Sequence, residues 1–170
     1  MRCKYILDTN AFFNFIKYVS LPQNEREELL DDNINKIKNA DCYISLISTV
    51  EIISVIGKYA RGGAGASTRM KPKVVKKWIK LVEDIISGQS PILKISTLSF
   101  SEEIIVEAQN IIHYALIHNF GSLDAMIAAT AKHHFGRQKY ENMSLITSDK
   151  GLKACLNKCG IPYWDVFKDC

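Results

Sequence analysis

The sequence has no apolar run that approaches the roughly 20 residues of a membrane-spanning helix. Its N-terminus also lacks a signal-peptide layout, because the apolar stretch there is short and no small-residue cleavage site follows it. These absences predict a cytoplasmic protein without a membrane partner. The length of 170 residues, of which 47% are hydrophobic, favours one compact globular domain over residues 1–170.

Paired cysteine motifs are missing as well. The five cysteines are scattered between Cys3 and Cys170. Cys155 and Cys159 could share a helix face, but they have no His or Cys partners at zinc-site spacing. The sequence therefore favours buried or incidental thiols over a zinc site or a disulfide.

Acidic residues are absent from a long internal stretch, between Glu51 and Glu83. That stretch holds eight basic residues: Lys58, Arg61, Arg69, Lys71, Lys73, Lys76, Lys77 and Lys80. Three glycines just after position 61 predict a flexible Gly-rich loop, and Pro72 predicts the start of a basic helix, so the two together occupy about 60–87. A basic segment suits a polyanionic partner, although a merely solvated helix face is the alternative.

What the sequence does contain is an alternation of short apolar segments with longer amphipathic ones. Strands are expected at 3–7, 42–46, 92–95, 144–147 and 161–166, and helices at 11–19, 22–39, 72–87, 123–134 and 151–158. Two further helices are expected, one capped by Ser48 or Thr49 and one opened by a capping box of Ser99 and Glu102. This alternation predicts an α/β fold with a parallel sheet and helices on both faces.

Four acidic residues stand at comparable places in this pattern. Asp8 and Asp149 each end a strand, whereas Glu51 and Asp124 are expected in the first turn of a helix. Strand carboxyl ends and the amino ends of the following helices lie at one edge of a parallel sheet, where such folds place their ligands. Each residue alone could be a helix cap or dipole partner. Together they favour a four-carboxylate site.

Such a cluster requires a counter-charge, because neighbouring carboxylates cannot all ionise unless something offsets them. A divalent cation does so, and oxygen ligands select Mg²⁺ or Mn²⁺ over zinc. Bound there, the ion would bridge the protein and a substrate phosphate and would activate a water molecule. A phosphatase using Asp8 as nucleophile is disfavoured, because position 10 is Asn where a second Asp is normally needed.

The sequence resembles the PIN-domain nucleases over nearly its whole length. The matching stretches are Ile6-Leu7-Asp8-Thr9-Asn10, Ile44-Ser45 through Thr49-Val50-Glu51, Ser122-Leu123-Asp124 through Ala131, and Leu145-Ile146-Thr147-Ser148-Asp149 through Leu152. The resemblance implies a three-layer α/β/α sandwich and metal-dependent hydrolysis of RNA phosphodiester bonds. Within the family the chain is most similar to the VapC-type toxins of type II toxin–antitoxin pairs, which implies an antitoxin partner and a homodimer.

The resemblance also assigns roles to individual residues. It implies that Asp8, Asp124 and Asp149 hold the Mg²⁺ or Mn²⁺ ion, with Glu51 ligating directly or through water. Asn10, Thr147 and Ser148 would orient these groups by hydrogen bonds. The candidate RNA contacts are Arg69, Lys71, Lys73, Lys76 and Lys77. The alternative from a different class is a non-catalytic PIN-like module that binds RNA or a protein through the basic helix.

Overall fold

A computed structural model describes residues 2–62 and 70–167; within them, the side chain of Leu29 is left aside. The described strands form one parallel sheet in the order β3-β2-β1-β4-β5. They are β1 (Lys4–Leu7), β2 (Asp41–Ser45), β3 (Ile95–Leu98), β4 (Met143–Ile146) and β5 (Tyr163–Trp164). The central strand β1 aligns Leu7 with Ile44 of β2 and Ile146 of β4, so the three strands end together.

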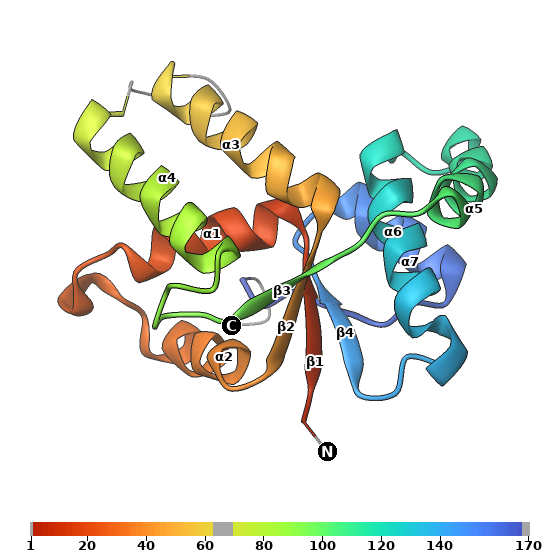
Figure 1. Ribbon diagram of the computed structural model, residues 1–170, viewed down its shortest axis with the longest axis horizontal. Coiled ribbons are helices and arrows are strands. Elements are labelled where there is room, and N and C mark those ends of the chain that lie inside the picture. The colour runs from red at the N-terminus through yellow and green to blue at the C-terminus, as the bar shows by residue number, and fades with distance from the viewer. Residues whose placement is uncertain (1, 63–69, 168–170) are drawn as a thin grey trace.

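Helices cover both faces of this sheet (Figure 1). The first group is α1 (Thr9–Val19), α2 (Glu28–Lys38), α3 (Leu46–Ala60) and α4 (Pro72–Ile86). The second is α5 (Glu102–Ile112), α6 (Ser122–Phe135) and α7 (Lys150–Cys159). Short 3₁₀ turns occur at Gln23–Glu25, His113–Leu116 and Gly136–Gln138. The expected three-layer α/β/α sandwich with a central parallel sheet is confirmed.

Two apolar clusters hold the layers together. Successive strand side chains point to opposite faces, so Leu7 packs with Phe12, Ile52 and other residues of the first helix group, while Ile6 packs with Ala128 and the second group. Each large side chain that is fully buried contributes about 1.5–3 kcal/mol. The sheet is therefore fixed from both sides, which fixes the edge where its strands end.

The expected helix over 22–39 is wrong at its start. After Pro22 there is only a 3₁₀ turn, and Arg26 has an extended backbone with φ −93° and ψ 141°. The Arg26 guanidinium donates to the carbonyls of Val19 and Leu21, both at 3.0 Å, and so satisfies acceptors at the end of α1. This local partnership interrupts the helix, and α2 begins at Glu28.

The helix after β2 starts earlier than expected, and its buried face differs from the one that helical spacing predicts, which is Val50, Ile53 and Ile56. It begins at Leu46 directly after the strand, without a side-chain cap from Ser48 or Thr49. Its inward face is Ser48, Ile52 and Ile56, whereas Val50 is 72% and Ile53 42% exposed. The segment is apolar on nearly every side, so periodicity alone could not select the buried face.

Three smaller corrections concern the other boundaries. The third strand is Ile95–Leu98 instead of 92–95, because its pairing with β2 starts only at Ile95 beside Cys42. Ser101, not Ser99, precedes α5, and it makes no side-chain cap bond. The last strand is only two residues long, since β4 pairs with it only at Tyr163 and Trp164.

Over residues 2–62 and 70–167, no helix is long and apolar enough to cross a membrane. The expected Gly-rich loop falls largely on 63–69, outside the described residues.

Candidate active site

Asp8 lies at the centre of the edge where the strands end. It follows β1 and caps α1, and its Oδ1 accepts a hydrogen bond of 2.5 Å from the backbone N–H of Ala11. Its Oδ2 accepts a hydrogen bond from the hydroxyl of Thr147. Asp8 is only 2% exposed, and this burial raises its pKa to about 7, against the two hydrogen bonds. The charges of Asp149 and Asp124 raise the pKa further.

Thr147 joins Asp8 to the neighbouring strand end. Its fully buried hydroxyl, besides donating to Asp8, accepts the backbone N–H of Asp149 at 3.0 Å. Asp149 caps α7 by accepting the N–H of Leu152 on Oδ1 at 2.9 Å. The turn after β4 thus holds one oxygen of Asp149, while the other oxygen makes no hydrogen bond among the described residues.

Glu51 reaches the same edge from α3. It lies in the second turn of that helix, so the expectation that it occupies the first turn is wrong. Its position is set by Thr9, whose hydroxyl donates to Oε2 of Glu51 at 2.5 Å. Sequence reasoning gave Thr9 no role. The available signal was that Thr9 follows Asp8 directly at the start of α1.

Asp124 is the third residue of α6, as its sequence position predicts. Its Oδ2 accepts the backbone N–H of Gly121 at 2.8 Å. Burial raises the pKa of Asp124, and the nearby charges of Asp149 and Glu51 raise it further, while the Gly121 hydrogen bond lowers it. Asp149 thus raises the pKa of both Asp8 and Asp124, and Glu51 raises that of Asp124, so the four predicted acids lie near one another.

Gly151 allows two parts of this cluster to approach. A Cβ at this position would lie 2.4 Å from the carbonyl oxygen of Asn119 and 3.2 Å from Cα of Phe120. The start of α7 therefore packs directly on the loop that leads into α6. Because α7 follows Asp149 and α6 carries Asp124, this backbone contact keeps the two acids close.

The donor set fits a divalent cation of the Mg²⁺ or Mn²⁺ type. All four side chains offer carboxylate oxygens, the ligands that such ions prefer. Within the described residues, no group of three or more Asp, Glu, His or Cys side chains already has the spacing of a metal site. The pKa values of Asp8 and Asp124 are raised mainly by burial, and the neighbouring carboxylates raise them further, so negative charge is unfavourable at both positions. A cation at this edge would offset that charge.

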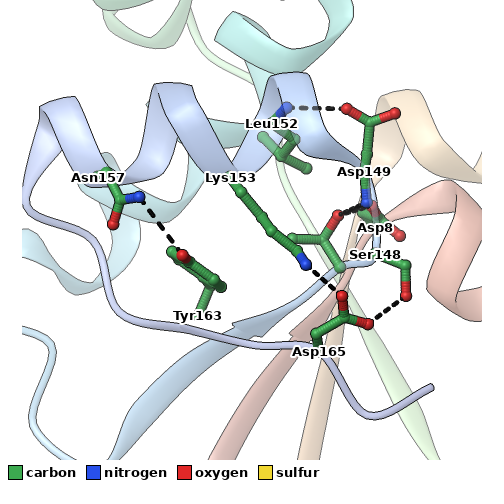
Figure 2. A network of polar contacts seen from close by, with 9 residues as sticks. Asp8, Ser148, Asp149, Leu152, Lys153, Asn157, Tyr163 and Asp165 are labelled. Carbon is green, nitrogen blue, oxygen red and sulfur yellow. Dashed lines mark hydrogen bonds and ion pairs between the residues drawn. The ribbon is translucent and has the colours of Figure 1, made fainter. Parts of the chain in front are cut away.

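The three residues expected to orient the acids behave differently from one another. Thr147 bonds Asp8 and the Asp149 backbone as described. Asn10 is exposed and, among the described residues, its side chain makes no hydrogen bond to the four acids. Ser148 points away from them and donates to Asp165 at 2.5 Å (Figure 2).

Asp165 was not anticipated from the sequence. It is 3% exposed and also forms an ion pair with Lys153 of α7 (Figure 2). The available signal was a charged residue inside the apolar run Tyr163-Trp164-Asp165-Val166-Phe167, which predicts a buried and therefore paired carboxylate.

A cleft of about 420 Å³ opens beside Glu51 and Asp149. Its lining includes Asn10, Asn14 and Lys58. The cleft is therefore polar and has a cation at its wall.

The basic helix lies further away than the sequence suggests. Lys71, Lys73, Lys76 and Lys77 are exposed around the start of α4, while Arg69 lies outside the described residues. That start lies beside the far end of α3 (Figure 1). From Glu51 to Ala60 there are nine steps of about 1.5 Å, or roughly 14 Å, along α3. None of these four lysines lines the cleft beside Glu51 and Asp149.

The PIN domain family model matches residues 5–155. The chain therefore belongs to the PIN domain family, whose members are nucleases that generally use divalent metal ions. Among curated protein sequences, none matches this chain significantly.

Solved structures share its fold at low sequence identity. FitAcB from Neisseria gonorrhoeae is similar with a TM-score of 0.59 and 18% identity, over 96% of this chain and 99% of that one. VapBC-1 from nontypeable Haemophilus influenzae gives 0.58 and 17%, over 97% and 99%. DNA-bound VapBC from Salmonella typhimurium gives 0.57 and 19%, over 96% and 98%.

Proposed function

We propose that this protein is a metal-dependent endoribonuclease that hydrolyses RNA phosphodiester bonds at the carboxyl edge of its sheet. The observation that supports the proposal is that Asp8, Glu51, Asp124 and Asp149 approach one edge of the sheet, where Thr147 joins Asp8 to the Asp149 backbone, Thr9 contacts Glu51 and Gly151 packs on the loop before Asp124. Four neighbouring acids face one lysine, Lys58, in the adjoining cleft, so most of their negative charge is not offset by the protein. Their retention at one edge is explained if they hold Mg²⁺ or Mn²⁺.

Each acid has a distinct part in this proposal. Asp8, Asp124 and Asp149 hold the ion, with Glu51 ligating directly or through a water molecule. When bound, the ion supplies a water nucleophile and stabilises charge on the phosphate. Thr147 keeps Asp8 and the Asp149 backbone in register, and Thr9 fixes Glu51. Asn10 and Lys58 line the adjoining cleft, where they can contact the RNA.

The same fold supports a role as the toxin of a type II toxin–antitoxin pair. The similar solved structures bear the names FitAcB and VapBC, and VapC-type toxins are the part of the family that the sequence resembles. An antitoxin and a second copy of this chain are the proposed protein partners. Exposed apolar residues support such contacts, most of all Leu116 at 88% and Ile117 at 79% exposure.

The homodimer has a direct test in sedimentation velocity. We expect the wild type to sediment as a dimer and the Leu116→Ser, Ile117→Ser double variant as a monomer. Val106→Ser serves as the control, because Val106 is 52% exposed and lies on α5. A monomeric wild type at every concentration would reject the dimer and leave the Leu116–Ile117 surface to the antitoxin.

Cleavage of a mixed RNA pool tests the enzyme itself. The purified wild type is incubated with Mn²⁺, with Mg²⁺ or with EDTA, beside Asp8→Asn. Cutting that requires the metal and that the variant lacks is the expected result. A folded wild type that binds neither metal nor cuts RNA would favour the alternative, a non-catalytic PIN-like module that binds RNA or protein.

A further inference from the structure

The segment after α7 carries a buried carboxylate with two partners. One oxygen of Asp165 accepts the hydroxyl of Ser148 and the other accepts Lys153 (Figure 2). The side chain of Asp165 is 4% exposed and that of Lys153 is 20% exposed. Removing such charges from water costs several kcal/mol per ion, which is offset only by good pairing. Asp165 is well paired, because each of its two oxygens has a donor.

The two contacts of Asp165 lie on either side of Asp149. Ser148 directly precedes that acid in the turn after β4, and Lys153 lies in the first turns of the helix that Asp149 caps. The backbone N–H of Thr147 also donates to the carbonyl of Trp164 at 3.2 Å. The turn is therefore held from one side by Asp8 and from the other by the segment at 164–165.

Anchoring of the chain end does not require this ion pair. Val166 and Ile161 are 0% and 2% exposed, so they already attach the segment to the apolar clusters. A buried ion pair is often no more stabilising than apolar side chains of the same size. Instead, the two contacts of Asp165 fix the orientation of the peptide between Ser148 and Lys153, which includes Asp149.

We propose that Asp165 is a positioning residue of the candidate metal site, acting through Ser148 and Lys153 on Asp149. One oxygen of Asp149 accepts the N–H of Leu152, and its other oxygen makes no hydrogen bond among the described residues. The direction of that free oxygen follows the orientation of the turn, which Asp165 holds. The site thus depends on a residue beyond the segment 5–155 that matches the family. This inference rests on the proposed function, since the ligand of Asp149 is the proposed ion.

The test is calorimetric titration of the full-length protein with Mn²⁺, using variants that separate positioning from anchoring. Ser148→Ala removes the hydroxyl between Asp165 and the turn, and Asp165→Asn removes the charge while keeping the shape. Tyr163→Phe is the matched control. It deletes the hydroxyl that accepts a 3.3 Å hydrogen bond from Asn157, which also joins α7 to the final segment but does not reach the turn.

We expect Mn²⁺ affinity to fall about tenfold or more in Ser148→Ala and Asp165→Asn, as is typical when a partner of a metal ligand is lost. Tyr163→Phe should bind like the wild type, and Ser148→Thr, which keeps a hydroxyl, should restore most of the affinity. Thermal unfolding in EDTA identifies variants that do not fold. If Asp165→Asn does not fold, the Mn²⁺ affinity of Ser148→Ala alone tests the positioning role.

Two results would overturn the inference, and they differ. Wild-type affinity in both Ser148→Ala and Asp165→Asn would mean that Asp165 only anchors the chain. A wild type that binds no Mn²⁺ would reject the proposed metal site itself, and the positioning role with it.

Discussion

At the scale of single residues, Asp8 combines a central position with an unfavourable environment. Its pKa of about 7 exceeds the ordinary value of 3.8, chiefly because of burial. A carboxyl group with a raised folded-state pKa stabilises the protein most when it is protonated. That contribution is fully present below about pH 4 and is lost as the pH rises through about 7.

The first prediction therefore concerns Asp8→Asn in the metal-free protein. The free energy of unfolding of the wild type should fall between about pH 4 and 7 by up to about 1.4 kcal/mol per pH unit, and the variant should lack this slope. At pH 8 the variant should be the more stable by a few kcal/mol, yet it should not cleave RNA. Urea unfolding in EDTA at several pH values measures the effect.

Glu141→Gln provides the control for this experiment. Glu141 is exposed and precedes β4, so it lies toward the opposite edge of the sheet. Its variant should keep the wild-type slope. Equal slopes for Asp8→Asn and the wild type would contradict the explanation by burial, and an unfolded Asp8→Asn would argue that Asp8 serves the fold more than a metal.

Gly151 gives a second prediction at this scale. In Gly151→Ala the new methyl group meets the Asn119 carbonyl at 2.4 Å, so the loop before α6 must move. We expect a loss of about 1–3 kcal/mol in stability. We also expect weaker Mn²⁺ binding, because Asp124 and Asp149 separate. Thermal unfolding and metal titration measure the two effects.

Gly160→Ala separates these two effects. Gly160 ends α7 with φ +67°, and no atom lies within 4 Å of an added Cβ. The strained backbone should cost about 1–2 kcal/mol, but the variant should bind Mn²⁺ like the wild type. If both variants lost metal affinity equally, general destabilisation would account for the loss.

The sequence predicts the acids better than their partners, for a physical reason. Asp8, Asp124 and Asp149 belong to short local patterns, a strand end or a helix start, and these patterns place them correctly. Thr9 acts on Glu51 and Ser148 acts on Asp165 across many residues of chain. Such pairs form only through tertiary packing, which no local pattern records.

At the scale of elements, α4 is the strongest candidate for an electrostatic contact with RNA. Lys73, Lys76 and Lys77 are exposed, and among the described residues none of them takes part in an ion pair. Lys80 on the same helix differs, because it pairs with Asp84 at 2.8 Å. The helix therefore offers three uncompensated charges and one compensated charge.

The third prediction compares these lysines in the Asp8→Asn background, in which RNA should stay intact. Changing Lys73, Lys76 and Lys77 to Ala should weaken RNA binding and reduce the slope of log affinity against log salt by up to about 2, at roughly 0.7 per phosphate contact. Lys80→Ala should change the slope much less. Fluorescence anisotropy at several salt concentrations measures this, and an unchanged slope in the triple variant would mean that this face is only solvated.

The elements themselves were predictable to different degrees. α6 begins at Ser122, one residue before the expected start, and α7 ends at Cys159 because Gly160 follows it with a φ of +67° that only glycine adopts easily. The buried face of α3 was not predictable, because apolar residues occupy nearly all its sides. The start of α2 was hidden because Arg26 makes a tertiary contact with the end of α1.

At the scale of the whole molecule, the candidate site lies where two halves meet. Glu51 comes from α3, which packs with the first apolar cluster, while Asp124 comes from α6, which packs with the second. Between them the sheet provides Asp8 and the turn that holds Asp149. Packing therefore brings the two helical layers together at a point where their charges repel each other.

The last prediction follows from this arrangement. An ion that binds the folded protein but not the unfolded chain adds about 2.7 kcal/mol at a concentration 100 times its Kd. Mn²⁺ should therefore raise the melting temperature of the wild type and slow amide exchange at the start of both α3 and α6, because it draws the two layers together. Asp8→Asn should show neither effect. A buffer without Mn²⁺ at the same ionic strength controls for the effect of salt. Protection confined to one helix would mean that the ion binds one layer alone, with fewer than the four proposed ligands.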